Sequence, residues 1–385
     1  KMWTPYQLFI AVGMVITGSI NTLATKWADK QSAPGPNGVV HAFDHPFLQA
    51  VGMFIGEFSC LVVFQIWIRY QKWTIKKDPT KEVNFGNQKF SPFLFLGPAV
   101  CDMTATSLMY IGLNYTYASS FQMLRGAIIV FTALLSVAFL RQFITKKKWL
   151  GIFLVLVGLV LVGLSDILFN SNSQYGPNEV ITGDLIILIA QIISATQVVL
   201  EEKFVNGKDI LPLQAVGWEG FFGMTILGTL LIPMYFIPAS SFSNNPRGVL
   251  EDALDGLYQI GQNSTLALAQ IGSVCSIAFF NFFGISVTKQ LNATTRMVLD
   301  SIRTIVIWAV SLAVKWSTFQ YLQAIGFVVL IGGTVIYNNL APIPCLDPPP
   351  QVQPINESKP EYSDEAASEK TPLLYDTQSI TNQTA

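Results

Sequence analysis

The chain contains ten long apolar runs, and no other feature constrains its fold as strongly. Because the hydrocarbon core of a bilayer is about 30 Å thick, roughly 20 consecutive apolar residues are needed to cross it as a helix. Backbone groups in lipid have no water to bond with, and a helix satisfies them internally. The runs therefore predict an all-α membrane protein with ten transmembrane helices. They lie at 5–26, 47–68, 91–112, 118–140, 148–167, 182–204, 213–237, 265–288, 292–314 and 319–340.

The composition agrees with this class and argues against several others. Of 385 residues, 51% are hydrophobic and only 12% are charged, whereas a soluble domain is about 25% charged. A net charge of −1 gives no basic field for nucleic acid, so we expect no nucleic-acid partner. No paired-cysteine motif, phosphate loop or nucleophile elbow appears, so we expect neither an enzyme nor a metal or cofactor. His41 and His45 share one loop, where we favour two solvated residues over a shared metal site.

The first run begins near the start of the sequence and could be mistaken for a cleavable signal peptide. Its apolar part is longer than the 7–15 residues that are typical of a signal core, and it ends in the polar segment TKWADK. We therefore favour a retained first helix, with the signal peptide as the alternative.

Lysine and arginine are distributed unevenly between the two sides of the predicted membrane. Cytoplasmic loops carry an excess of these residues. Thirteen lie on one side, namely Arg69, Lys72, Lys76, Lys77, Lys81, Lys89, Arg141, Lys146, Lys147, Lys148, Lys203, Lys208 and Lys289, against Lys30, Arg247 and Lys315 on the other. This bias places both termini in the cytosol, as an even number of spans requires.

The chain contains an internal repeat. A slide of 175 residues places ASSFQMLRG at 118–126 on ATTRMVLDS at 293–301, and so matches the fourth and fifth runs with the ninth and tenth. LQAVG at 48–52 recurs at 213–217, and matches the second run with the seventh. Because each half has five helices, an odd number, the two halves are expected to be inverted relative to each other.

A third near-copy, LQAIG at 322–326, shows that similar short strings arise among apolar helices, so chance similarity is the alternative to a repeat. Our prediction is two inverted five-helix repeats and a tail. The boundaries are 1–170 for the first repeat, 171–340 for the second, and 341–385 for a disordered cytosolic tail.

Two long motifs resemble a known family. YASSFQMLRGAIIVFTALLSVAFL at 117–140 is similar to the fourth helix of solute carrier family 35, the nucleotide-sugar-transporter-like branch of the drug/metabolite transporter superfamily. SVTKQLNATTRMVLDSIRTIVIW at 286–308 and DMTATSLMYIGLNYTYASSFQMLRG at 102–126 look closest to its F subfamily. The resemblance covers roughly residues 2–340. It implies a ten-helix carrier that works by alternating access around a central cavity, and it implies no particular substrate.

Several charged residues lie within the apolar runs, where a charge costs about 2.5–3.5 kcal/mol and usually faces a cavity or a partner. Arg296, Asp300 and Arg303 are spaced i, i+4, i+7 and share one helix face. They form either an internal ion-pair ladder or a cavity lining that binds an anion through the planar guanidinium groups. The candidate substrate-binding residues are Arg125, Gln122, Arg296, Asp300, Arg303 and Lys289.

Carboxyl groups in the runs are candidates for proton coupling, because an acid in a low-dielectric cavity can exchange a proton. Glu57 and Glu219 each follow one copy of the LQAVG string, and Asp102 is a third candidate. The alternative for Glu57 and Glu219 is a hydrogen bond to a neighbouring helix. Glu57 lies nine residues after its leucine and Glu219 six after its own, so we expect an asymmetric proton path.

Other positions predict packing or a surface element. Small residues four or seven positions apart let helices approach closely; these are Gly52 with Gly56, Gly151 with Gly158, and Gly326 with Gly333. In the loop 238–263, apolar residues recur at helical spacing at 250, 254, 257 and 258. This spacing predicts a short interfacial helix, with a cap over the lumenal entrance as the alternative.

The tail is rich in Pro, Ser and acids and is predicted to be disordered. It contains EKTPLL, in which Glu369 precedes the pair Leu373 and Leu374. This pattern resembles the acidic dileucine signal that cytosolic sorting adaptors bind. It predicts a lysosomal or late endosomal membrane, with the Golgi as the main alternative and mitochondria as a weaker one.

Together these features predict a secondary transporter of a small organic solute, with an anionic, nucleotide-sugar-like solute as one candidate. The alternative is a non-transporting membrane adaptor or receptor on the same fold. The expected partners are the substrate, the lipid bilayer and a sorting adaptor, and a homodimer is allowed.

Overall fold

The computed structural model describes residues 3–78, 85–113, 115, 124–169, 177–239, 245–315 and 321–338. The chain divides into two compact units, Lys1–Leu346 and Asp347–Ala385, and every described residue lies in the first. Both predicted repeats fall within this first unit, and the boundary between them stays a prediction. The second unit lies outside the described residues.

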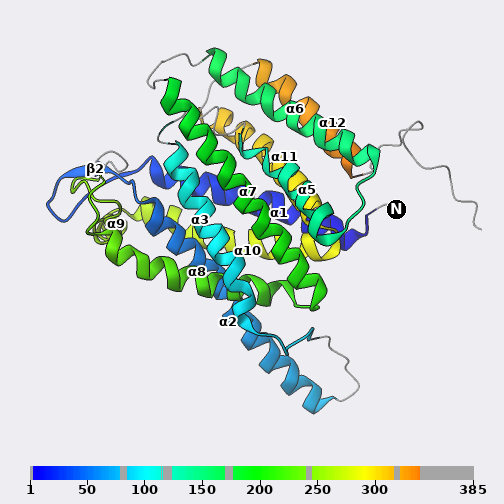
Figure 1. Cartoon of the computed structure of the whole chain (residues 1–385). Helices are drawn as coiled ribbons and strands as arrows, with labels where there is room; N and C mark the ends of the chain where they lie inside the picture. Colours follow the sequence, from blue (N-terminus) through cyan, green and yellow to red (C-terminus); the bar gives the residue numbers. More distant parts are fainter. Residues whose placement is uncertain are drawn as a thin grey trace, which may run out of the picture. The chain divides into compact units, whose positions relative to one another are not determined.

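The described part of the chain forms eleven α-helices, one 3-10 turn and one β-hairpin (Figure 1). The 3-10 turn η1 (Pro92–Phe95) leads directly into α3. The helices are α1 (Pro5–Asp29), α2 (Pro46–Lys77), α3 (Leu96–Leu113), α5 (Ile128–Leu140), α6 (Lys146–Phe169), α7 (Pro177–Gly207), α8 (Pro212–Met234), α9 (Ala253–Gln262), α10 (Ser264–Gln290), α11 (Ala293–Ala313) and α12 (Tyr321–Tyr337).

Each of the ten predicted runs overlaps one of these helices, and α9 is the predicted short helix of the loop 238–263. Six segments are long and apolar enough to cross a membrane, namely α1, α2, Pro92–Met109, Ile181–Gly207, α8 and α10. Ile128–Leu140 and Ala324–Tyr337 are shorter apolar helices. A multi-pass membrane protein is therefore confirmed, whereas ten crossings in inverted halves stay a prediction.

The expectation of an all-α chain is wrong in one place. Strands β1 (Ser32–Pro34) and β2 (Val40–Ala42) pair antiparallel, with Ala33 opposite His41. The loop between them closes through a hydrogen bond from the amide of Gly35 to the carbonyl oxygen of Val39. Gly38 has a φ of +73°, which glycine adopts without a steric penalty. A hairpin this short shows no alternation that a sequence pattern could detect.

Polar caps define several helix ends. Thr4 and Gln7 form a capping box at α1, which satisfies two free amide groups of the first turn. Asn263 accepts hydrogen bonds from the amides that open α10. The side chain of Asn292 accepts a 2.7 Å hydrogen bond from the amide of Thr295. The cap at Asn292 explains how α10 and α11 separate across a very short connection.

The loops predicted to be cytosolic contact one another at one end of the helices, which we call the basic end. Lys289 Nζ lies 2.7 Å from Asp209 Oδ1, and the amide of Asn87 donates to the carbonyl oxygen of Asp209. Gln142 bonds to Glu202, which also accepts a 2.8 Å hydrogen bond from the amide of Ala293. The predicted grouping of these loops on one side fits this arrangement, and their cytosolic location stays a prediction.

Helices that are distant in sequence pack in pairs. α1 packs on α10, α3 on α7, α2 on α8, α5 on α7 and α6 on α12. Secondary contacts join α1 with α11, α5 with α11, α2 with α10 and α3 with α8. The first five of the ten helices therefore pack mainly against the last five, and the core lies between them.

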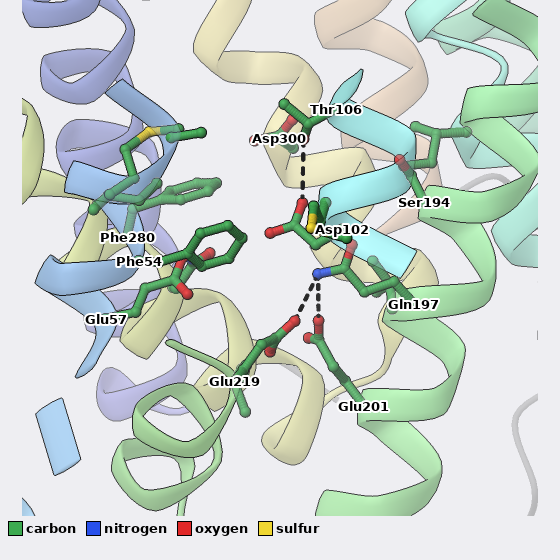
Figure 2. Close-up of a pocket in the computed structure, with 18 of the residues that line it drawn as sticks. Phe54, Glu57, Asp102, Thr106, Ser194, Gln197, Glu201, Glu219, Phe280 and Asp300 are labelled. Carbon is green, nitrogen blue, oxygen red and sulfur yellow. Dashed lines mark hydrogen bonds between the residues drawn. The ribbon is translucent and has the colours of Figure 1, made fainter. Parts of the chain in front are cut away.

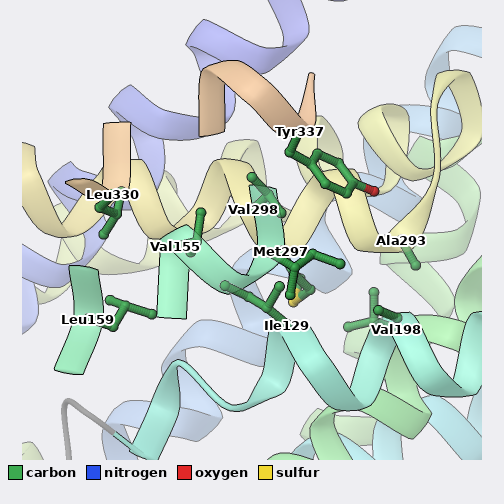
Figure 3. Packing of buried hydrophobic residues seen from close by; sticks show 11 residues of the cluster. Ile129, Val155, Leu159, Val198, Ala293, Met297, Val298, Leu330 and Tyr337 are labelled. Carbon is green, nitrogen blue, oxygen red and sulfur yellow. The ribbon is translucent and has the colours of Figure 1, made fainter. Parts of the chain in front are cut away.

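Small residues permit the close packing of α6 on α12. Figure 3 shows buried side chains of the surrounding cluster, among them Val155 of α6 and Leu330 of α12. A Cβ atom added to Gly158 would lie 2.7 Å from the carbonyl oxygen of Gly326, and one added to Gly333 would lie 2.6 Å from the amide nitrogen of Val155. A Cβ atom on Gly151 would clash with the backbone of Tyr337. The predicted packing role of these glycines is confirmed, because backbone approaches backbone at each.

Glycines also set the spacing around α2. A Cβ atom on Gly56 would clash with the carbonyl oxygen of Val274 on α10, whereas Gly52 makes only an ordinary contact with the same residue. On α8, Gly217 faces Leu61 and Gly220 faces the backbone of Phe58. This close approach brings Glu57 of α2 and Glu219 of α8 toward the same interior space.

Candidate functional site

A cavity of about 210 Å³ lies between the helices (Figure 2). Apolar side chains such as Phe54 and Phe280 form part of its wall, together with polar groups from several helices. Eight charged residues line it, namely Glu57, Asp102, Arg125, Glu201, Glu219, Arg296, Asp300 and Arg303. Such a density of charge inside an apolar bundle marks a functional site by default.

Five helices bring most of these groups together. Glu57 comes from α2, Asp102 from α3, Glu201 from α7, Glu219 from α8 and the other three from α11. Arg125 precedes α5 in the chain. The cavity lining therefore comes from both predicted repeats. Arg125 and Asp300, which the slide of 175 residues pairs in sequence, both line the cavity.

Amide side chains connect the carboxyl groups. Gln197 Nε2 on α7 donates to Glu201 Oε1 at 3.0 Å and to Glu219 Oε1 at 2.8 Å (Figure 2). Asn281 Nδ2 on α10 donates to Glu57 Oε1. Each of these acids thus accepts a hydrogen bond from a neutral amide. For Glu57 and Glu219 this is the predicted alternative of a hydrogen bond to a neighbouring helix, and it coexists with a place in the cavity wall.

The arginines of α11 pair differently from the predicted ladder. Arg296 forms an ion pair with Glu201 of α7, with side chains 7% and 1% exposed. Arg303 Nη2 lies 3.2 Å from Asp300 Oδ2 on the same helix, and its guanidinium carbon lies 4.9 Å from the ring centre of Phe280. One rung of the predicted ladder is present, and the other is replaced by a bond across helices.

Among the polar residues of the site, Glu201, Gln197 and Asn281 are missing from the sequence-based prediction. Glu201 lies near the end of the run 182–204, next to Glu202 and Lys203. Gln197 and Asn281 are uncharged, and a search for charges within apolar runs does not find them. The available signal was spacing: Gln197 and Glu201 are i, i+4 and share a face of α7.

Other predicted residues do not join the cavity lining. Lys289 bonds to Asp209 and to the carbonyl oxygen of Ile210 at the basic end, and it is absent from the residues that line the cavity. Gln122 lies outside the described residues, as does the tail motif of Glu369, Leu373 and Leu374. Their predicted roles stay predictions.

The cavity lining is rich in charged groups of both signs. Five carboxyl groups and three arginines face it, so acids outnumber bases. An ionised acid without a basic partner is costly inside a membrane, and its charge has to be neutralised by an arginine, a proton or a bound solute. Among the residues that the structure describes, no group of three or more His, Cys, Asp or Glu is placed to hold a metal ion.

The two histidines differ from the expectation of solvated loop residues. His45 is 1% exposed and its Nδ1 lies 2.7 Å from Glu251 Oε1. His41 Nε2 lies 3.1 Å from Asp255 Oδ2, with both side chains mostly buried. The prediction was wrong because the acids that pair with them come from the α9 region, more than 200 positions away in the sequence.

Known proteins show which family this architecture belongs to. Residues 6–164 match the EamA-like transporter family. Human solute carrier family 35 member F6 is 58% identical over 339 residues, which cover 88% of this chain and 90% of the human protein. The chain belongs to solute carrier family 35.

More distant relatives of this solute carrier agree. An uncharacterised protein of Schizosaccharomyces pombe is 32% identical, with 88% of this chain and 99% of that protein covered. The UDP-galactose transporter of the same yeast is 24% identical over 76% of this chain and 79% of its own length. A solved crystal structure matches with a TM-score of 0.59 at 14% identity, over 87% of this chain and 98% of that one, and shows the fold alone. The resemblance indicated by the sequence is confirmed.

Proposed function

We propose that this solute carrier is a secondary transporter, in which two inverted five-helix halves give a small organic solute alternating access to the central cavity. The observation that carries the proposal is the cavity itself, because its charged lining comes from helices of both predicted halves. In transporters built from inverted repeats, substrate and coupling-ion sites lie near the midplane where the repeats meet.

The helix contacts support two-fold-related halves. In the predicted repeat, α1 corresponds to α7, α2 to α8, α3 to α10, α5 to α11 and α6 to α12. Exchanging each helix with its counterpart converts the α1–α10 contact into α7–α3, the α1–α11 contact into α7–α5, and the α2–α10 contact into α8–α3. The α2–α8, α5–α11 and α6–α12 contacts convert into themselves. Every one of these contacts therefore has its counterpart, as a two-fold relation requires.

The arginines favour an anionic solute, which would reach them by exchange. Arg296 is occupied by Glu201 and Arg303 by Asp300, so an incoming carboxylate or phosphate would have to replace these acids. A proton taken up by such an acid would release its arginine for the solute. Proton uptake and anion binding would then be coupled, with Glu57 and Glu219 as further proton acceptors through the cavity.

Uptake into proteoliposomes tests this proposal. A library of nucleotide sugars, organic anions and organic cations would be offered at two internal pH values. We expect saturable uptake of an anion that depends on the pH difference and falls at least several-fold in Glu57→Gln and Glu219→Gln. Asp209→Asn, which removes an exposed acid at the basic end, is the matched control and should leave uptake unchanged. Equal pH dependence in all variants would exclude coupling through these acids.

A failure to transport any solute, by protein shown to be folded, would favour the non-transporting adaptor. The charged cavity supports the transporter, since a bundle without a cavity and with mutually satisfied charges would suit the adaptor better. Uptake of a cation but of no anion would support the transporter and would overturn the proposal that the arginines bind the solute.

We also propose that the acidic dileucine motif of the tail directs the protein to lysosomal or late endosomal membranes through a cytosolic sorting adaptor. The support is the sequence Glu369 to Leu374 and the predicted cytosolic tail. Replacing Leu373 and Leu374 with alanine should move a tagged protein to the cell surface, as seen by surface biotinylation. An unchanged distribution, or a Golgi location of both proteins, would contradict this proposal.

A further inference from the structure

A buried cluster of ionisable side chains joins α9 to the first turn of α2, apart from the central cavity. His45, which immediately precedes α2, bonds through Nδ1 to Glu251 Oε1 at 2.7 Å. Its other ring nitrogen, Nε2, lies 3.3 Å from Asp255 Oδ2 on α9. His45 and Glu251 are each 1% exposed, and Asp255 is 6% exposed. One imidazole thus stands between two buried carboxyl groups.

The same cluster reaches the cavity wall. Glu251 Oε2 accepts a 2.9 Å hydrogen bond from the amide of Phe47 and a longer one from the amide of Leu48. These amides belong to the N-terminal turn of α2, whose dipole favours a negative charge. Phe47 lines the cavity. Glu251 is therefore shared between the histidine and the helix end that forms part of the cavity.

The charges around His45 are mostly negative. The groups that face it or its partners are His41 of β2, Asp44 beside it, Asp29 of α1, Arg247 and Asp252 before α9, and Asp255 within α9. Arg247 Nε lies 3.6 Å from Asp252 Oδ2, and Asp29 accepts a hydrogen bond from Gln49. In the described part of the chain, neither Glu251 nor Asp255 forms an ion pair with an arginine or a lysine. A protonated histidine is therefore the counter-charge that these acids have.

Two polar atoms inside the cluster face each other without forming a hydrogen bond, and the second of them also lies 3.1 Å from His41 Nε2. These are His45 Nε2 and Asp255 Oδ2, which are 3.3 Å apart. A buried polar atom without a partner costs about 1–3 kcal/mol. Attraction between an imidazolium and a carboxylate offsets that cost, whereas a neutral His45 that carries its proton on Nδ1 would leave its Nε2 unsatisfied.

We infer that this cluster is a proton-binding site separate from the cavity acids, and that a proton on His45 holds α9 against the N-terminal turn of α2. When the proton leaves, Glu251 remains buried without a counter-charge, and Asp255 keeps only the less buried His41, whose Nε2 lies 3.1 Å from its Oδ2, as a basic neighbour. The contact between α9 and the cavity wall then loosens. The site would make access at this end of the cavity depend on pH, independently of which solute is carried.

The pKa of His45 supports the direction of this effect. Burial lowers the pKa of His45, but the hydrogen bond to Glu251 and the charges of Glu251, Asp255 and Asp44 outweigh burial and raise it above the ordinary value of 6.5. Because the folded-state pKa is raised, the stabilisation is fully present below about pH 6.5 and is lost as the pH rises through the raised value. Acid therefore tightens the contact, and alkali releases it.

Hydrogen–deuterium exchange of α9 in nanodiscs would test this inference, with both faces at the same pH. Exchange times would be scaled for the intrinsic pH dependence of the amides, at about pH 6 and about pH 8.5. We expect α9 to be several-fold better protected at the lower pH in the natural protein. His45→Gln should abolish this difference, and His41→Gln, the matched control at the only other histidine, should retain most of it.

An unchanged pH difference in His45→Gln, or no difference in the natural protein, would overturn the inference. If His45→Gln does not fold, Asp255→Asn provides the decisive measurement. Removing one of the two acids should move the midpoint of the protection curve to lower pH, and an unmoved midpoint would overturn it. Since exchange needs no substrate, this result stands or falls separately from the transport proposal.

Discussion

Replacing Arg296 with methionine should destabilise the protein much more than the loss of an exposed ion pair. Methionine keeps the apolar character of the arginine stem but leaves Glu201, which is 1% exposed, as a buried carboxylate. Removing one partner of a buried pair costs about 3–5 kcal/mol. Glu201 would keep one hydrogen bond, from Gln197, so we expect the lower half of that range.

Two controls separate burial from the simple loss of a charge. Lys289→Met removes a pair whose acid, Asp209, has a side chain 61% exposed, and an exposed pair is worth about 0–1 kcal/mol. The double variant Arg296→Met with Glu201→Met removes both charges, and so leaves no buried carboxylate. We expect its stability to lie closer to that of the natural protein than the single variant does, because a paired apolar replacement is often neutral.

The buried thiol of Cys60 provides the assay. Cys60 lies in the core beside α10, whereas Cys275 is exposed. With the other three cysteines changed to serine, labelling of Cys60 by a thiol-reactive dye during heating reports unfolding. The reasoning is refuted if Arg296→Met unfolds no earlier than Lys289→Met, or if the double variant is as unstable as the single one.

Two further predictions follow from packing and from the cavity network. Gly333→Ala should lower the free energy of unfolding by about 1–3 kcal/mol through overpacking, because the added Cβ would meet the backbone of α6. Its control is Gly332→Ala, which has open space beside it and should be neutral or stabilising in the same unfolding assay. Gln197→Leu should lower the free energy of unfolding by about 1–3 kcal/mol and reduce proteoliposome uptake, because Glu201 and Glu219 lose a shared hydrogen-bond donor. Its control is Thr196→Val, which breaks only a hydrogen bond within the same helix. Equal behaviour within either pair would contradict the corresponding contact.

Much of the fold could be predicted from the sequence because lipid imposes a simple rule on the backbone. Apolar runs long enough to span a bilayer have to be helical, and every predicted run overlaps a helix. The glycines at 151, 158, 326 and 333 also identified a helix seam correctly, since only small residues allow backbones to approach closely. The short helix α9 was visible from its helical spacing. Family membership was visible from long, specific motifs.

The partners of the polar side chains were decided only by tertiary structure. Spacing on α11 allowed Arg296 to pair within its own helix or to line a cavity, and its partner is Glu201, 95 positions away. His45 looked like a loop residue, yet it is buried against Glu251, 206 positions away. Periodicity along one helix tells which residues share a face, but not which helix lies opposite. The sequence by itself therefore determined the helices and the kind of protein, while the packing of one half against the other determined which charges meet.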